Sequence, residues 1–143
     1  MDCWSMISPM DLPQYVKRNA ELSGTQIEDL RVAVGWDRME GYYDRILARS
    51  YAHFSVHQES GGLIAFVNVI SDGIADAFLV DLMVHPDWQG RGIGQALVNR
   101  AIEELRADGI RAIEVIFEPH LESFYRACGF HLMQSGVIDN WNS

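Results

Sequence analysis

Three glycines at alternate positions, Gly90, Gly92 and Gly94, lie between a segment with the pattern of a strand and one with the pattern of a helix. Glycine has no Cβ atom to keep a ligand away from the backbone. The N–H groups of such a loop can converge on an anion at the positive end of the helix that follows. The spacing therefore predicts an anion-binding loop suited to a phosphate-bearing ligand.

Two common phosphate-binding motifs do not fit this loop. A dinucleotide-binding fold needs G-x-G-x-x-G and a second βαβ half, whereas this chain has G-x-G-x-G and only 143 residues. A P-loop needs Gly-Lys-Ser/Thr, which does not follow here.

Asp81 is the residue whose sequence context best suits a general base. It stands in the otherwise apolar run from Ala77 to Val84, where a carboxylate is costly unless it is paired or used. A salt-bridged or exposed carboxylate is the alternative interpretation. His85 is a rival base, because the ordinary pKa of histidine is closer to neutral pH, although a position at the end of a strand needs no chemistry to explain it.

The elements that must position these residues follow from apolar periodicity and from turn residues. The predicted elements, in order, are a weak strand over Cys3–Ile7, two short helices between Leu12 and Ser50 joined through Gly35-Trp36, strands over Tyr51–His57, Leu63–Ile70 and Asp76–Val84, a helix from Ile93 to Asp108-Gly109, a strand over Ala112–Phe117, a short helix over Leu121–Ala127 and a last strand over Phe130–Ile138. The order β-αα-βββ-α-β-α-β predicts an antiparallel meander followed by a βαβ crossover.

Two motifs resemble those of the GCN5-related N-acetyltransferases (GNAT). Gln89, Gly92 and Gly94 match the family signature Gln/Arg-x-x-Gly-x-Gly/Ala, and the segment from Phe124 to Phe130 matches Phe-Tyr-x-x-x-Gly-Phe. The resemblance extends along essentially the whole chain. It implies an α/β (α+β) GNAT fold with a mixed, mostly antiparallel sheet of six to seven strands and about four helices, in one domain over residues 1–143.

The same resemblance implies a site for acetyl-CoA as cosubstrate. The pantetheine arm is expected to bind the backbone of Leu82, Met83 and Val84. The pyrophosphate is expected to bind the loop and the first turn of the helix, namely Gln89, Gly90, Arg91, Gly92, Ile93, Gly94 and Gln95. Arg91 is expected near a phosphate, with a solvated surface arginine as the alternative.

Catalytic and acceptor-binding residues are also implied by the resemblance. Tyr125 is expected to contact acetyl-CoA near its sulfur and to protonate the departing thiolate, and Asp81 is expected to serve as the base. A packing role is the alternative for Tyr125. Trp36 and Asp37 are candidates for holding the acceptor, although they could equally pack a loop onto the core.

We therefore expect acetyl transfer to a primary amine, most simply of a small molecule, by direct attack in a ternary complex. A protein lysine or N-terminal acetyltransferase and a non-catalytic acyl-CoA-binding module are the alternatives. A water chain could replace Asp81 or His85 as the path for the proton.

Composition limits the partners. The net charge of −9 argues against nucleic acid and anionic membranes, which attract a positive field, and favours a cationic small molecule. Cys3 and Cys128 have no metal-ligand spacing and are interpreted as reduced thiols of a cytoplasmic protein. No signal peptide or membrane span is predicted, and family resemblance makes a homodimer plausible.

Overall fold

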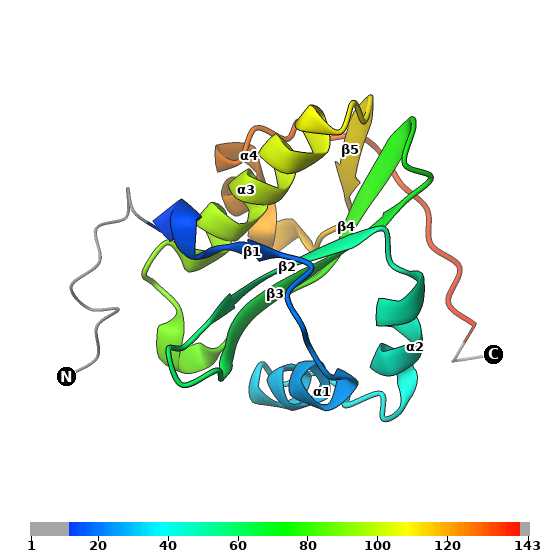
Figure 1. Cartoon of the computed structure of the whole chain (residues 1–143). Helices are drawn as coiled ribbons and strands as arrows, with labels where there is room; N and C mark the ends of the chain where they lie inside the picture. Colours follow the sequence, from blue (N-terminus) through cyan, green and yellow to red (C-terminus); the bar gives the residue numbers. More distant parts are fainter. Residues whose placement is uncertain (1–11, 141–143) are drawn as a thin grey trace.

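A five-stranded sheet lies between two groups of helices (Figure 1). The computed structural model describes residues 12–140. The strands are β1 (Lys17–Arg18), β2 (Ala52–His57), β3 (Leu63–Ser71), β4 (Asp76–Val84) and β5 (Ala112–Val115). They are arranged in the order β1-β2-β3-β4-β5; β1 to β4 pair antiparallel, and β5 pairs parallel with β4. The sheet is therefore mixed and mostly antiparallel, as predicted.

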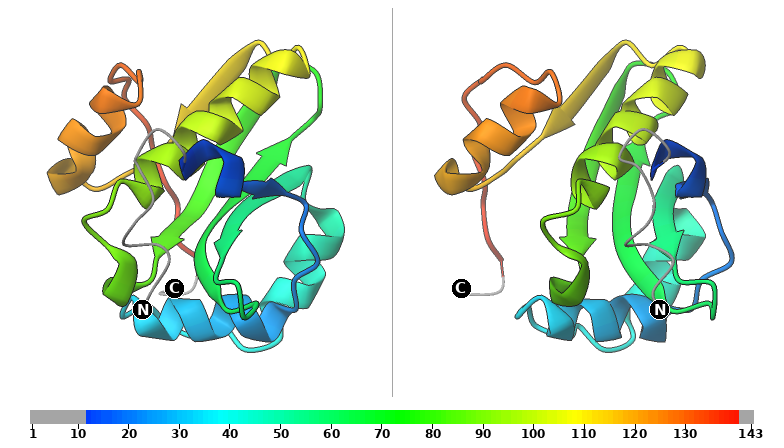
Figure 2. Two further views of the ribbon diagram at one scale, coloured as in Figure 1. Left: turned by 60° about the vertical axis from the view of Figure 1, so that its left-hand side comes forward. Right: turned by 90° about the vertical axis from the view of Figure 1, so that its left-hand side faces the viewer.

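The helices cover both faces of this sheet. They are α1 (Gly24–Ala33), α2 (Tyr42–Arg49), α3 (Ile93–Ala107) and α4 (Glu122–Ala127). Helices α1 and α2 lie on one side and α3 on the other, while α4 lies beyond the end of β5 (Figures 1 and 2). Because α3 connects β4 to the parallel strand β5, the predicted βαβ crossover is confirmed.

Local sequence signals explain where the helices begin. Ser23 and Gln26 form a capping box at the start of α1, in which each side chain bonds the backbone N–H of the other residue. Helix α3 instead begins at Gly92, which has a left-handed φ of +82°. The two caps fix where α1 and α3 begin.

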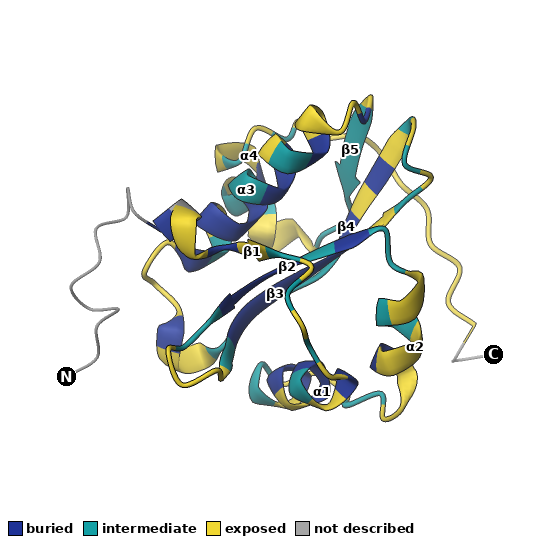
Figure 3. Ribbon diagram, in the orientation of Figure 1, coloured by how far each residue is buried: buried dark blue, intermediate teal, exposed yellow. Residues whose placement is uncertain are grey.

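The sheet separates two apolar clusters, visible as dark inner faces in Figure 3. Alternation along the strands sends neighbouring side chains to opposite faces. The larger cluster packs the sheet against α3 and includes Phe54, Val67, Leu79, Leu97 and Leu105. The smaller cluster packs it against α1 and α2 and contains Ile27, Leu30, Tyr43, Phe66 and Met83.

The prediction of a last strand over Phe130–Ile138 was wrong. This segment forms no ladder in the described structure, and residues 131–140 are all exposed. A strand needs the backbone of a partner as well as an apolar sequence, and Figure 2 shows this segment extending away from the sheet. The sheet of residues 12–140 therefore has five strands, not six or seven.

The other differences concern the ends of the sheet. The predicted strand over Cys3–Ile7 lies outside the described residues. Strand β1 lies inside the region from Leu12 to Ser50 that was predicted to be helical, and its two residues are too few to show a periodicity. Strand β5 ends at Val115, two residues before the predicted end at Phe117.

The described residues contain neither a membrane-spanning helix nor a cluster of metal ligands. No helix within residues 12–140 is long and apolar enough to cross a bilayer. No three His, Cys, Asp or Glu side chains gather in this part of the chain as a metal site would require.

Candidate active site

Strand β4 carries a bulge beside β3. Phe66 pairs with Met83 and Asn68 with Val80, so two steps along β3 correspond to three along β4. Asp81 lies in this interval and has a φ of +59°, in the left-handed region. A bulge redirects side chains out of regular alternation. The adjacent residues Val80 and Asp81 accordingly line the same pocket.

Strands β4 and β5 are paired over only part of their length. The parallel ladder ends where Leu79 pairs with Val115, and the chain after β5 leads away toward α4 (Figure 2). Among the described residues, no strand pairs with the second half of β4 on this side. Unpaired strand backbone can bind an extended ligand as an added strand. Leu82, Met83 and Val84 lie in this open half, and their contact with pantetheine stays a prediction.

The glycine loop leads from β4 into α3. Gly90 and Gly92 have φ values of +78° and +82°, which side chains of L-residues rarely adopt. A Cβ atom on Gly94 would lie 3.4 Å from Val84 Cγ2. The first N–H groups of α3, which begins at Ile93, have no partner within the helix. This arrangement can bind an anion, so the loop suits the phosphates of acetyl-CoA.

The polar side chains of the loop contact its own backbone. Gln89 Nε2 donates to the carbonyl of Val84 at 3.0 Å, which ties the loop to the end of β4. Arg91 Nη2 donates to the carbonyl of Asp87 at 3.4 Å, and its guanidinium lies 4.7 Å from the centre of the Trp88 ring. Arg91 is exposed, and its pairing with a phosphate stays a prediction.

Asp81 belongs to a hydrogen-bonded network with two residues of the helices. Arg31 Nη1 donates to the hydroxyl of Tyr43 at 2.9 Å, and that hydroxyl donates to Asp81 Oδ2 at 2.9 Å. Arg31 Nη1 also lies 3.7 Å from Asp81 Oδ1. Burial, and then the charge of Asp81, raise the pKa of Tyr43, so its hydroxyl stays protonated as a donor. The network fixes the carboxylate of Asp81 at the bulge.

Tyr125 of α4 lies in an aromatic cluster. It is 5% exposed, and its ring centre lies 4.6 Å from that of Phe117 and 4.9 Å from that of Phe124. Burial, and then Cys128, raise the pKa of Tyr125 to about 12. The hydroxyl therefore remains protonated at physiological pH. Its role at the sulfur of acetyl-CoA stays a prediction.

The remaining predicted residues lie near the site without entering the pocket. Trp36 is stacked 5.3 Å below the guanidinium of Arg31, and the backbone carbonyl of Asp37 accepts from Arg31 Nε at 2.6 Å. Both residues thus hold Arg31, and a contact with the acceptor stays a prediction. His85 Nδ1 accepts from the N–H of Asp87 at 3.1 Å and so caps a 3₁₀ turn.

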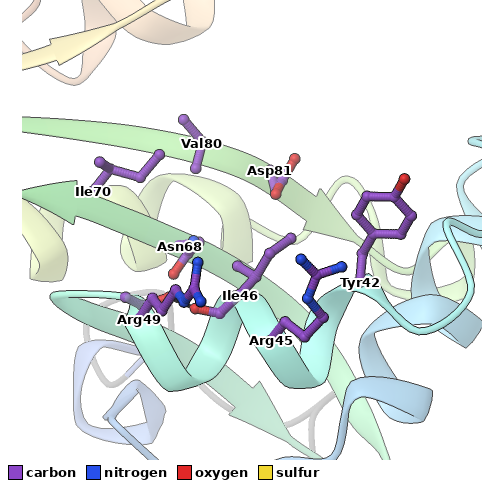
Figure 4. A pocket seen from close by; sticks show the side chains of 9 residues that line it. Tyr42, Arg45, Ile46, Arg49, Asn68, Ile70, Val80 and Asp81 are labelled. Carbon is purple, nitrogen blue, oxygen red and sulfur yellow. Dashed lines mark hydrogen bonds between the residues drawn. The ribbon is translucent and has the colours of Figure 1, made fainter. Parts of the chain in front are cut away.

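A pocket of about 360 Å³ opens between α2 and strands β3 and β4. Arg45 and Arg49 reach into it from α2, Asn68 from β3 and Asp81 from β4 (Figure 4). Ile46 contributes apolar surface to the wall. The bulge thus gives the pocket a carboxylate, and the helix gives it two guanidinium groups.

Sequence reasoning missed Arg31, Asn68, Arg45 and Arg49. Arg31 and Asn68 could have been found from the sequence, since Arg31 follows Ile27 by four residues on the buried face of α1 and Asn68 interrupts the apolar run of β3. Both are polar groups in apolar surroundings, as Asp81 is. The two arginines of α2 carried no such signal, because exposed arginines on a short helix are ordinary.

Comparison with known proteins places this geometry in a family. Residues 50–132 match the model of the acetyltransferase (GNAT) domain. The chain belongs to the GNAT family. The N-acetyltransferase ycf52 of Pyropia yezoensis is 31% identical over 127 residues, which cover 86% of this chain and 73% of the relative. Serotonin N-acetyltransferase 2, chloroplastic, from rice (Oryza sativa subsp. japonica) is 36% identical over 76 residues, covering 53% of this chain and 38% of the relative.

Solved GNAT structures share the fold. A GNAT family N-acetyltransferase from Escherichia coli, solved in complex with CoA, has a TM-score of 0.63 and 17% identity, covering 77% of this chain and 66% of that one. The open half of β4, the glycine loop and α3 of this GNAT chain are thus parts of an acetyl-CoA-dependent N-acetyltransferase.

Proposed function

We propose that this N-acetyltransferase acetylates the primary amine of a small molecule by direct attack on acetyl-CoA in a ternary complex. The observation that carries the proposal is the pocket of about 360 Å³ that contains Asp81. This volume is near the lower end of the range of about 300–1,000 Å³ for small-molecule sites. The pocket is therefore large enough to hold a small acceptor whole.

Acetyl-CoA supplies the activated acetyl thioester, and two parts of this chain suit it. The open backbone of Leu82, Met83 and Val84 would hold the pantetheine arm in an extended conformation. The glycine loop and the first turn of α3 would hold the pyrophosphate. These contacts would place the thioester beside the bulge of β4.

The acceptor must lose a proton before its nitrogen can attack. An alkyl amine with a pKa near 10 is only about one part in a thousand neutral at pH 7. In this proposal the carboxylate of Asp81 accepts that proton, directly or through a water molecule, while Tyr43 and Arg31 hold the carboxylate in place. As the N–C bond forms and the C–S bond breaks, a backbone N–H of β4 stabilises the negative charge on the carbonyl oxygen.

Tyr125 stabilises the departing sulfur. A thiol has an ordinary pKa of about 8.5, below the pKa of about 12 for Tyr125. Complete proton transfer from the phenol would therefore be uphill. The hydroxyl acts as a hydrogen-bond donor to the thiolate, which then takes its proton through solvent.

The test of this role is Tyr125→Phe, which keeps the ring and removes the hydroxyl. A hydrogen bond to a charged group contributes about 1.5–3 kcal/mol, so kcat should fall about 10- to 150-fold. The dissociation constant for acetyl-CoA, measured by calorimetry, should change little. Release of free CoA is followed with a panel of amines that includes serotonin and a polyamine.

Tyr51→Phe is the matched control, because the Tyr51 hydroxyl bonds Asp108 away from this site and its loss should leave kcat unchanged. Binding of acetyl-CoA without turnover on any amine or peptide would favour a regulatory module. Turnover confined to lysine or N-terminal peptides would favour a protein acetyltransferase.

We also propose a single domain over 1–143, a cytoplasmic location and a homodimer. The chloroplastic rice relative makes the compartment a point to test by microscopy of the tagged protein.

A further inference from the structure

We infer that the acceptor amine carries an anionic group, a carboxylate or a phosphate, which Arg45 and Arg49 bind while Asp81 receives the amine. This inference rests on the proposed function. It departs from the cationic partner that the net charge of −9 favours, because the charges inside the pocket differ from the charge of the whole chain.

Arg45 and Arg49 lie on the same face of α2, toward the pocket. They are four residues apart on α2, which places them on the same face of the helix. Both line the pocket, and neither has a carboxylate partner among the described residues. The guanidinium of Arg45 lies 6.0 Å from the centre of the Tyr42 ring. Planar guanidinium groups bind carboxylates and phosphates through paired N–H donors.

The attraction of a helix C-terminus for cations explains in part why an arginine without a carboxylate partner among residues 12–140 stands in α2. Arg49 is in the last turn of α2, where a positive charge is favoured. The helix dipole does not account for Asn68, however, which projects from the facing strand. A ligand in this pocket therefore needs support from a group other than the two arginines, and Asn68 provides that support.

Asn68 has a buried acceptor without a partner. The residue is 2% exposed, and its Oδ1 has no hydrogen-bond partner within the described structure. Buried polar groups are nearly always satisfied, so each exception calls for an explanation. Asn68 lines the same pocket as Arg45 and Arg49. A ligand that donates an N–H or O–H to Oδ1 would satisfy it.

The layout of the pocket sets the spacing of the ligand. Figure 4 shows Asp81 and Arg49 toward opposite ends, with Ile46 between them. Arg45 lies one turn before Arg49 on α2, between it and Tyr42. An amine and an anion separated by a short aliphatic or sugar framework fit this layout. The ligand class is thus a small amino acid or an amino phosphate.

Matched pairs of acceptors test the inference. The anionic probes are 4-aminobutyrate and O-phosphoethanolamine, and the uncharged probes are butylamine and ethanolamine, each assayed with acetyl-CoA for release of CoA. We expect kcat/KM at least tenfold higher for the anionic member of each pair. 4-Aminobutyrate tests the carboxylate and O-phosphoethanolamine tests the phosphate, so the ratio of their kcat/KM values identifies the preferred anion. Equal rates within both pairs would overturn the inference and leave the proposed function intact.

Variants then assign the preference to residues. Arg45→Gln and Arg49→Gln should each reduce the preference for the anionic probe about tenfold while changing butylamine turnover little. Arg111→Gln removes the same charge at β5, outside the pocket, and should change neither. A preference that survives the double variant Arg45→Gln/Arg49→Gln would overturn the assignment.

Binding in the absence of acetyl-CoA separates this inference from the proposed function. NMR titration of the full chain with 4-aminobutyrate and with O-phosphoethanolamine should shift the signals of α2 and β3, and Asn68→Leu should weaken that binding without lowering the Tm. Binding without any turnover would retain the anion site and reject the proposed function. Binding of neither probe at millimolar concentration, with turnover of butylamine, would reject the anion site alone.

Discussion

Asp81 adopts a backbone conformation that few residues other than glycine, asparagine and aspartate tolerate. Its φ of +59° turns the carboxylate toward Tyr43 and Arg31 instead of leaving it in the regular alternation of β4. A strained residue held by two partners at a bulge is typical of a functional position. Asp81 is thus paired with Arg31, as the salt-bridged alternative expected, and its role as the base stays a prediction.

Substitution of Asp81 should separate chemistry from folding. Asp81→Asn keeps an acceptor for Tyr43 and tolerates the left-handed φ, so we expect a loss of only about 1–2 kcal/mol in stability. The value of kcat should fall about 10²-fold or more, because the amide cannot accept the proton. Asp81→Val should cost at least about 1 kcal/mol further through backbone strain. Urea unfolding and CoA release measure both effects, and full activity of Asp81→Asn would exclude Asp81 as the base.

The raised pKa of Tyr125 should make the unfolding free energy of the protein fall at alkaline pH. Its pKa in the folded protein is about 12, above the ordinary value of about 10. Because folding raises this pKa, the neutral phenol stabilises the folded protein by about 2–3 kcal/mol relative to the ionised one. This stabilisation is complete below about pH 10 and is lost as the pH rises toward 12. Tyr125→Phe should therefore flatten the fall in unfolding free energy over this range. Identical slopes for the two proteins would show that the phenol is not desolvated.

At the scale of elements, α3 carries a left-handed glycine at each end. Gly92 precedes its first residue with a φ of +82°, and Gly109 follows its last turn with a φ of +87°. Neither position would crowd an added Cβ atom, since the nearest neighbour of Gly92 is Leu12 Cδ1 at 3.7 Å and none lies within 4 Å of Gly109. The two glycines differ only in which end of the helix they serve, so they form a matched pair.

Alanine at each end of α3 should affect stability equally and binding unequally. Gly92→Ala and Gly109→Ala should each cost about 1–2 kcal/mol, because alanine is strained at positive φ. Only Gly92→Ala should weaken acetyl-CoA binding, by about tenfold, since it alters the N-terminal loop. Calorimetry with acetyl-CoA and thermal unfolding provide the two readouts. Equal affinities for the two variants would argue that the loop does not hold the phosphates.

At the scale of the whole molecule, the chain after α4 adds little to the core. Phe130 packs against Tyr125, with ring centres 5.9 Å apart, whereas residues 131–140 are exposed. Ile138 is 89% exposed, so its apolar surface is not used within the described part of one copy.

Two truncations should show where the core ends. Ending the chain after His131 should change the unfolding free energy by no more than about 1 kcal/mol, as expected for exposed residues. Ending it after Gly129 should cost about 1–3 kcal/mol more, because Phe130 is lost from the aromatic cluster. Thermal unfolding measures both, and size-exclusion chromatography of the same proteins reports on the proposed homodimer. A large loss from the shorter deletion would mean that the exposed segment packs somewhere.

The sequence by itself determined β2 to β5, α3 and α4 within a few residues, because apolar periodicity and turn residues act over short distances. For α1 and α2 it predicted the two helices and their connection at Gly35-Trp36, but not where each helix begins and ends. It also suggested the glycine loop and Asp81 from local patterns and Tyr125 from the family resemblance, and the roles of all three stay predictions. The prediction of a last strand failed because a ladder needs a partner that the sequence of one segment does not specify.

Only the tertiary structure decided which polar residues meet. Tyr43 and Asp81 are 38 positions apart, and the bulge that brings them together arises from the pairing of β3 with β4. Arg45, Arg49 and Asn68 share a pocket because α2 packs across that pair of strands. Such contacts depend on how distant elements pack, and no local pattern encodes them.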